Sequence, residues 1–190
     1  MAELYLGLLH YPVLNRAGQS VASAITGLDL TDIARSAHTY QVRRYFLINP
    51  LPSQRRIAER MLRYWLSAEP EPSHRREALQ QVTIVATLED SLRQVFAAEG
   101  QRPLLVGTSA RRLQGRPIGF DRLRAQLERE RQPVYLLFGT GWGLAEAARE
   151  MLDCLLPPLE GPGDYNHLSV RAAVAIVLDR LRSRTVIQEE

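Results

Sequence analysis

Three short loops rich in glycine and small polar residues occur in the C-terminal half of the sequence, each after an apolar, strand-like run. They are Gly107-Thr108-Ser109-Ala110-Arg111, Gly139-Thr140-Gly141-Trp142-Gly143, and a longer loop that ends in Tyr165-Asn166-His167-Leu168-Ser169. Glycines let a ligand approach the backbone closely, and a helix that begins after a loop offers unpaired N–H donors. The pattern therefore predicts a small-molecule site that is built largely from backbone groups.

The spacing of the second loop argues against the two common nucleotide-binding motifs. A phosphate-binding P-loop ends in Gly-Lys followed by Ser or Thr, and this loop does not. The dinucleotide fingerprint is G-x-G-x-x-G near the first strand, with an acidic residue about 20 positions later. Here the spacing is G-x-G-x-G, late in the chain. A plain structural turn remains the alternative for this loop, and a nucleotide-dependent oxidoreductase or hydrolase remains a rival function.

Alternating strands and helices are expected to position these loops. The predicted strands are 4–11, 44–49, 82–86, 103–106, 134–138 and 155–156, with a β-tolerant run at 21–26. The predicted helices are 29–41, 53–68, a short one from His74, 89–99, 120–130, 144–151 and 168–182, with a stiff linker at 69–73. The alternation indicates an α/β fold with a mainly parallel sheet flanked by helices. Ligands bind beyond the carboxyl ends of such strands, where the three loops lie.

Length and composition limit the class of protein. The 190 residues, of which 45% are hydrophobic and 24% charged, predict a single soluble domain over residues 1–190, with 53–80 as a possible helical insertion. We expect no membrane span, since no apolar run of about 18 residues occurs. A single cysteine, Cys154, excludes a disulfide framework, and the N-terminal residues lack a signal-peptide pattern, so we expect a cytoplasmic protein. His10, His38 and His74 lie too far apart in sequence to indicate a metal site.

Every one of the 24 basic residues is arginine. Residues 33–76 contain nine arginines and only three glutamates, and residues 101–131 contain eight arginines and only three acidic residues. Arginine binds phosphate through a planar fork of donors, so two such stretches suit an RNA-binding surface. The alternatives are a GC-rich genome, which favours arginine codons, and solvated helix faces.

Taken together, the loops resemble the SPOUT methyltransferases. The strand that leads into Phe138-Gly139-x-Gly141-x-Gly143-Leu144, and Asn166-His167-Leu168-Ser169 before an apolar helix, are similar to the last two motifs of that superfamily. The segment Asp29-Leu30-Thr31-Asp32-Ile33-Ala34-Arg35-Ser36-Ala37 resembles its first motif. The resemblance covers roughly residues 4–181, and it is closest to a bacterial group of predicted RNA methyltransferases that depend on S-adenosylmethionine (SAM).

The resemblance implies a C-terminal trefoil knot, a homodimer, and methyl transfer from SAM to tRNA or rRNA without a metal. It also implies that three loops hold the cofactor, through Gly107, Thr108, Ser109, Phe138, Gly139, Thr140, Gly141, Trp142, Gly143, Leu156, Tyr165, Asn166, His167, Leu168 and Ser169. Trp142 has two interpretations, as a stacking partner for a base or as packing over the glycine loop.

The catalytic candidates are Arg35, Asp29 and Asp32. By the resemblance, Arg35 orients or activates the RNA nucleophile. Asp29 and Asp32 are expected either to take a proton from a nitrogen such as guanine N1 or to serve only as helix-capping and first-turn carboxylates. Asp29, Thr140 and His167 depart from the pattern of the ribose-modifying members, so ribose oxygen and base nitrogen both remain open as targets. A catalytically silent knotted protein that binds RNA or cofactor in ribosome assembly is the alternative function.

Overall fold

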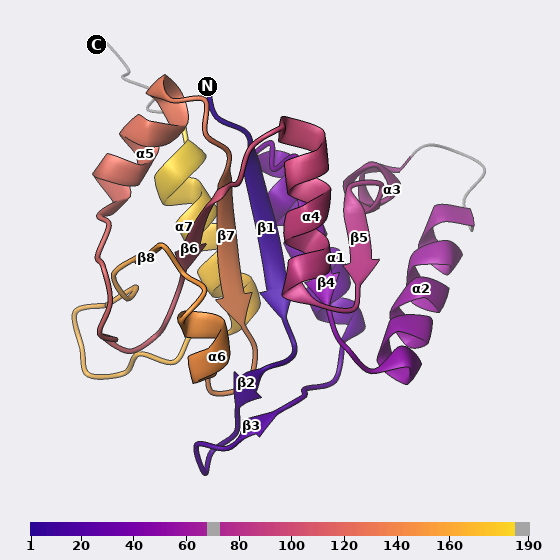
Figure 1. Ribbon diagram of the computed structural model, residues 1–190. Coiled ribbons are helices and arrows are strands. Elements are labelled where there is room, and N and C mark those ends of the chain that lie inside the picture. The colour runs from indigo at the N-terminus through magenta and orange to yellow at the C-terminus, as the bar shows by residue number, and fades with distance from the viewer. Residues whose placement is uncertain (68–72, 185–190) are drawn as a thin grey trace.

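The computed structural model describes residues 1–67 and 73–184 and shows an α/β fold (Figure 1). The strands are β1 (Leu4–Leu9), β2 (Val13–Leu14), β3 (Ser20–Val21), β4 (Arg44–Ile48), β5 (Val82–Val85), β6 (Leu104–Gly107), β7 (Val134–Gly139) and β8 (Cys154–Leu155). The helices are α1 (Gly27–Thr39), α2 (Pro52–Ser67), α3 (His74–Leu79), α4 (Leu88–Glu99), α5 (Phe120–Arg129), α6 (Glu146–Arg149) and α7 (Val170–Arg182). Six strands form one sheet in the order β5-β4-β1-β7-β6-β8, and all its neighbours are parallel. The predicted fold class is thereby confirmed.

Helices cover both faces of the sheet, and side chains alternate between the two cores. On β1, Leu4, Leu6 and Leu8 join a core that includes residues of α1, α5 and α7. Tyr5 and Leu9 point to the other face, where α4 and Ala148 of α6 pack. Strands that are buried on both faces consist of continuous apolar runs, and these runs allowed the parallel sheet to be predicted from the sequence.

The start of α1 differs from the prediction. We expected Asp29 or Thr31 as the N-cap, but the cap is Thr26, whose hydroxyl accepts a hydrogen bond from the Asp29 backbone N–H at 3.1 Å. Asp29 therefore lies inside the first turn, where a carboxylate interacts favourably with the helix dipole. At the C-terminal end of α4 the prediction is confirmed, because Gly100 ends that helix in the left-handed conformation.

Short elements account for the remaining differences. The β-tolerant run at 21–26 forms no strand beyond Val21, because only the two-residue strands β2 and β3 pair there, as an antiparallel hairpin. The helix predicted over 144–151 is reduced to Glu146–Arg149, and the last helix begins at Val170 rather than Leu168. Most of the linker predicted at 69–73 lies outside the described residues. Within residues 1–67 and 73–184, no helix is both long and apolar enough to cross a membrane.

The edge strand β8 lies between β6 and the chain that leaves β6. On one side it pairs with β6, and the Leu156 N–H donates to the Gly107 carbonyl at 3.0 Å. On the other side the Leu155 N–H donates to the Arg116 carbonyl at 2.9 Å, and the Ile118 N–H donates back to the Leu155 carbonyl at 2.9 Å. The connection from β6 to α5 thus brings residues 116–118 to the side of β8 that faces away from β6.

Replacing Gly7 by alanine is expected to destabilise the fold by about 1 to 3 kcal/mol, as overpacked core positions do. A Cβ at Gly7 would lie 2.5 Å from Tyr135 Oη. That hydroxyl has little freedom to move, because it donates a buried hydrogen bond to Ser91 Oγ at 2.9 Å. Urea unfolding measures the effect. Gly161→Ala is the matched control, since a Cβ there meets nothing within 4 Å; equal losses in the two variants would contradict the steric explanation.

Candidate functional site

A cleft of about 640 Å³ lies at the carboxyl ends of β7, β6 and β8. Its volume is within the range of ordinary small-molecule sites, about 300 to 1,000 Å³. It is lined by Ser23, Ala24, Asp29, 108–111, 138–143, Leu156, Pro157, Leu159, 166–171, Ala173 and Val177. The three loops that the sequence analysis singled out therefore meet in one place, together with the segment that precedes α1.

The glycine loop after β7 turns sharply against β2. The Trp142 N–H donates to the Leu14 carbonyl and the Leu14 N–H donates to the Gly143 carbonyl, both at 2.9 Å. Gly141 has φ +60°, and a Cβ there would lie 2.9 Å from that same Leu14 oxygen. A side chain at this position would meet both backbone strain and a clash with backbone. The loop therefore forms a tight structural turn, the alternative that the sequence left open, and it also lines the cleft.

Side chains join the three loops to one another. Arg111 donates from Nη2 to the Trp142 carbonyl at 2.9 Å, which joins the first loop to the second. Asn166 donates from Nδ2 to the Ala110 carbonyl at 2.9 Å, which joins the third to the first. Arg112 forms a bidentate ion pair with Glu160 at 2.9 and 3.0 Å outside the cleft. These hydrogen bonds connect the three loops that form the walls of the cleft.

The lining of the cleft combines apolar side chains with polar groups. Buried apolar side chains, Phe138 and Leu156 among them, form one part, and Val177 of α7 extends it. Polar groups and glycine backbone surround this apolar part. Small-molecule sites in proteins commonly combine an apolar lining with a few placed polar groups.

Asp29 is the acidic residue in the wall of the cleft, and it is 6% exposed. Its Oδ1 accepts from Arg171 Nη1 at 3.1 Å, and its Oδ2 accepts from the Thr26 hydroxyl at 2.7 Å. Arg171 also lies 3.5 Å from Asp32 Oδ2 through Nε. A buried carboxylate is costly unless it is paired and hydrogen-bonded, and Asp29 is both. The ion pair joins α1 to α7 across the cleft.

His10 follows β1 directly and is completely buried. Among the described residues, neither of its ring nitrogens has a hydrogen-bond partner. Burial lowers the pKa of His10, and the negative charge of Asp29 offsets part of that shift. The lowered pKa keeps the imidazole neutral at pH 7.

Most of the predicted cofactor residues line the cleft, but two do not. Gly107 is buried at the end of β6, where a Cβ would collide with Leu152, and Tyr165 is 80% exposed with its ring against His167. Two of the catalytic candidates also lie outside the lining: Asp32, which reaches the cluster through Arg171, and Arg35, which is exposed on α1. The sequence analysis missed Arg171. Its one visible signal was a charge in the otherwise apolar first turns of α7.

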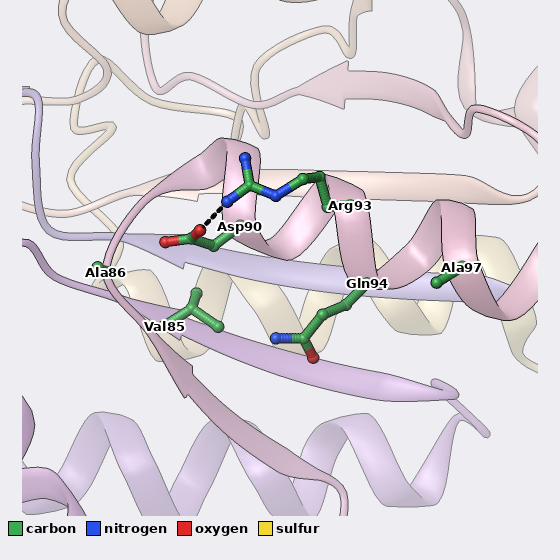
Figure 2. A pocket seen from close by; sticks show the side chains of 6 residues that line it. All are labelled: Val85, Ala86, Asp90, Arg93, Gln94 and Ala97. Atoms are coloured by element: carbon green, nitrogen blue, oxygen red, sulfur yellow. Dashed lines mark hydrogen bonds and ion pairs between the residues drawn. The ribbon is translucent and has the colours of Figure 1, made fainter.

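A second hollow of about 340 Å³ lies where β5 meets α4 (Figure 2). Asp90 and Arg93 form an ion pair at its edge, and Asp90 also accepts from the Thr87 backbone N–H in the capping box of α4. These charges neutralise each other and hold the start of the helix. In the part of the chain that the structure describes, no group of three or more His, Cys, Asp or Glu side chains is placed to hold a metal ion.

Comparison with known proteins points in one direction. A family model described as SAM-dependent RNA methyltransferase matches residues 3–183. An uncharacterized protein of Aquifex aeolicus is 38% identical over 184 residues, covering 96% of this chain and 89% of that protein. A tRNA (guanine-N(1)-)-methyltransferase of Oleidesulfovibrio alaskensis is 42% identical over 184 residues and covers 94% of this chain, which spans only 42% of that relative's length. An AdoMet-bound rRNA methyltransferase from Sinorhizobium meliloti has the same fold, with a TM-score of 0.56, 19% identity, and 95% of this chain and 56% of that chain covered.

The buried His10 predicts a pH dependence of stability. Because its pKa is lowered in the folded protein, the unfolded chain takes up a proton that the folded chain does not, once the pH falls below about 6.5. The stabilisation is present above that pH and is lost below it. We expect His10→Leu to reduce the fall in unfolding free energy between pH 7.5 and 5.5, as measured in urea. The exposed His38→Gln is the control, and an unchanged pH dependence in His10→Leu would rule out this role.

Proposed function

Since this chain belongs to the SAM-dependent RNA methyltransferase family, we propose that its cleft binds SAM and transfers the methyl group to a nucleotide of tRNA or rRNA. The observation that carries the proposal is the buried carboxylate of Asp29, held by an ion pair in the wall of a cleft that three strand-end loops form. The alternative, a catalytically silent protein that binds RNA or cofactor in ribosome assembly, needs the loops but not this carboxylate.

In the cofactor site, the apolar side chains of Phe138 and Leu156 flank the adenine, and backbone groups of 108–109 and 139–143 bind its polar edge. His167 and Ser169, at the entry to α7, lie at the polar rim. When bound, SAM supplies a methyl group that its sulfonium already makes electrophilic. What remains for the protein is to align the attacking atom and to remove its proton.

Asp29 is the proposed proton acceptor. A base must be within hydrogen-bond reach of the proton that it takes, and Asp29 is the carboxylate that the cleft wall presents. Arg171 and Thr26 hold its two oxygens in place. This role suits a nucleophile that carries a removable proton, such as guanine N1. Arg35 lies outside the cleft of its own chain, so its predicted role requires the cleft of a partner subunit.

A C-terminal trefoil knot is part of the proposal. We propose that the connection from β6 to α5 passes around β8. On one side of β8 the Gly107 carbonyl accepts a hydrogen bond from the Leu156 N–H, and on the other side residues 116–118 exchange hydrogen bonds with Leu155. The chain that leaves β8 continues through 156–169 to α7, which packs on α1 and α5. A segment enclosed in this way supports threading of the C-terminal part through the 107–119 loop.

We also propose a cytoplasmic homodimer. Leu28 is 58% exposed at the start of α1 and Leu168 is 46% exposed just before α7. Leu28 lies in the first turn of α1 and Leu168 lies two residues before α7, and these are the two helices that the Asp29–Arg171 pair connects. A partner subunit on this surface would cover them and bring an exposed Arg35 toward the opposite cleft. The guanine N1 specificity named for the longer relative belongs to that whole protein, so both tRNA and rRNA are tested.

Asp29→Asn is expected to lower the rate of methyl transfer by about 100-fold or more, in line with loss of a general base. The assay incubates the protein with labelled SAM and, separately, bacterial tRNA and rRNA, and measures label in each. Calorimetric titration should give a SAM affinity within about twofold of the wild type, because binding relies on the loops. Asp32→Asn is the control, with a rate within about threefold of the wild type.

The outcomes separate the candidate functions. A wild-type protein that binds SAM and transfers no label to either RNA supports the silent alternative. Tight binding of NAD or ATP and none of SAM would support the oxidoreductase or hydrolase instead. Full activity in Asp29→Asn would keep the methyltransferase and remove Asp29 as its base.

A further inference from the structure

Helix α2 carries one strongly basic, exposed face. Arg56, Arg60 and Arg63 are all exposed, and Ile57 and Tyr64 beside them are 49% and 62% exposed. At 100° per residue these five side chains fall within an arc of about 120°. Figure 1 shows α2 on the outer side of the β5 edge of the sheet. The face therefore looks into solvent along the length of the helix.

The opposite face of α2 fixes this orientation. Ala58 is completely buried, and Met61, Leu62, Trp65 and Leu66 pack against the core that includes α1. Arg75 of the neighbouring α3 lies over the Trp65 ring, with its guanidinium carbon 4.3 Å from the ring centroid. The helix cannot rotate its arginines inward without exposing this apolar face.

The charges on the exposed face are all of one sign. Glu59 is the acidic residue of α2, and at 100° per residue it falls about 40° beyond the edge of the arc. Among the described residues, none forms an ion pair with Arg56, Arg60 or Arg63. Arg56 and Arg60 are four residues apart and Arg60 and Arg63 three, spacings at which like charges on a helix repel. Such a face complements a polyanion.

The first turn of α2 is joined to the rim of the cleft. The Ile25 N–H donates to Gln54 Oε1 at 2.8 Å, and Asn49, just before the helix, donates from Nδ2 to the Ser23 carbonyl at 3.0 Å. Ser23 is part of the cleft lining. The basic face thus begins beside the cleft and extends away from it over a helix of 16 residues, which is about 24 Å long.

We propose that the exposed face of α2 binds the phosphate backbone of the substrate RNA, next to the nucleotide that enters the cleft. Arg56, Arg60 and Arg63 contact successive phosphates, and the ring of Tyr64 is available to stack on an unpaired base. The inference rests on the proposed function only in taking RNA as the substrate. It adds a surface within residues 53–80, the possible helical insertion predicted from the sequence.

The test compares two triple variants with equal change in charge. Arg56, Arg60 and Arg63 are replaced by Gln in one, and the exposed Arg93, Arg180 and Arg184, which lie outside both arginine-rich stretches, in the other. Binding of fluorescein-labelled bulk bacterial tRNA is measured by anisotropy between 50 and 300 mM salt. Each lost phosphate contact should reduce the slope of log K against log salt by about 0.7 to 0.9. We expect the α2 triple to lose about 2 to 3 from that slope and at least about tenfold in affinity, with the SAM affinity unchanged.

Each result decides for or against the α2 surface. Equal losses in both triples would show an unspecific charge effect and overturn the proposal, as would unchanged RNA affinity in the α2 triple. A shift in oligomeric state by light scattering, with RNA affinity intact, would identify the face as a protein contact instead. If the triple fails to fold, Arg60→Gln alone should still reduce the slope by about 0.7 to 0.9. RNA binding through α2 without methyl transfer by the wild type would keep this inference and reject the proposed function.

Discussion

The two-sided pairing of β8 holds the site together. A strand of two residues contributes little by itself, yet β8 and the residue after it bond to β6 on one side and to residues 116–118 on the other. This arrangement brings residues 108–111 and 166–171 to the same wall, although α5 and β7 separate them in the chain. The hydrogen bond from Asn166 to Ala110 and the ion pair of Arg112 with Glu160 reinforce the same junction. The hydrogen bonds of β8 therefore hold together the two connections that line the cleft.

An ion pair between α1 and α7 stabilises the cleft in addition to the backbone hydrogen bonds. The buried carboxylate of Asp29 would be unfavourable alone, and Arg171, 142 residues later in the chain, compensates it from α7. Arg171 is itself shared with the more exposed Asp32. The same contact that makes the carboxylate tolerable therefore also joins the first helix to the last. His10, the residue after β1, is a neutral side chain, since burial lowers its pKa.

Much of the fold could be predicted from periodicity, because strands buried on both faces appear as short apolar runs between amphipathic helices. The strand-end loops could be predicted for the same reason, since parallel topology places strand ends together. Thr26 was missed as the cap of α1 because Asp29 and Thr31 are equally good capping residues by type. The β2–β3 hairpin has strands too short to show any period. Arg171 could not be paired with Asp29 from sequence, since nothing local determines which faces of α1 and α7 meet.

The late position of β8 in the chain also imposes an order in time. Residues 156–171 form the third wall of the cleft, and they are synthesised after the other two walls. In the folded protein the Asp29 carboxylate takes its arginine from α7, and the loop 108–111 takes Asn166 from the segment between β8 and α7. A ribosome-bound chain that ends before Arg171 therefore carries the sheet without a finished site. A ligand that binds only the finished site favours the docked state by mass action, so the last step of folding and the first step of function stabilise each other.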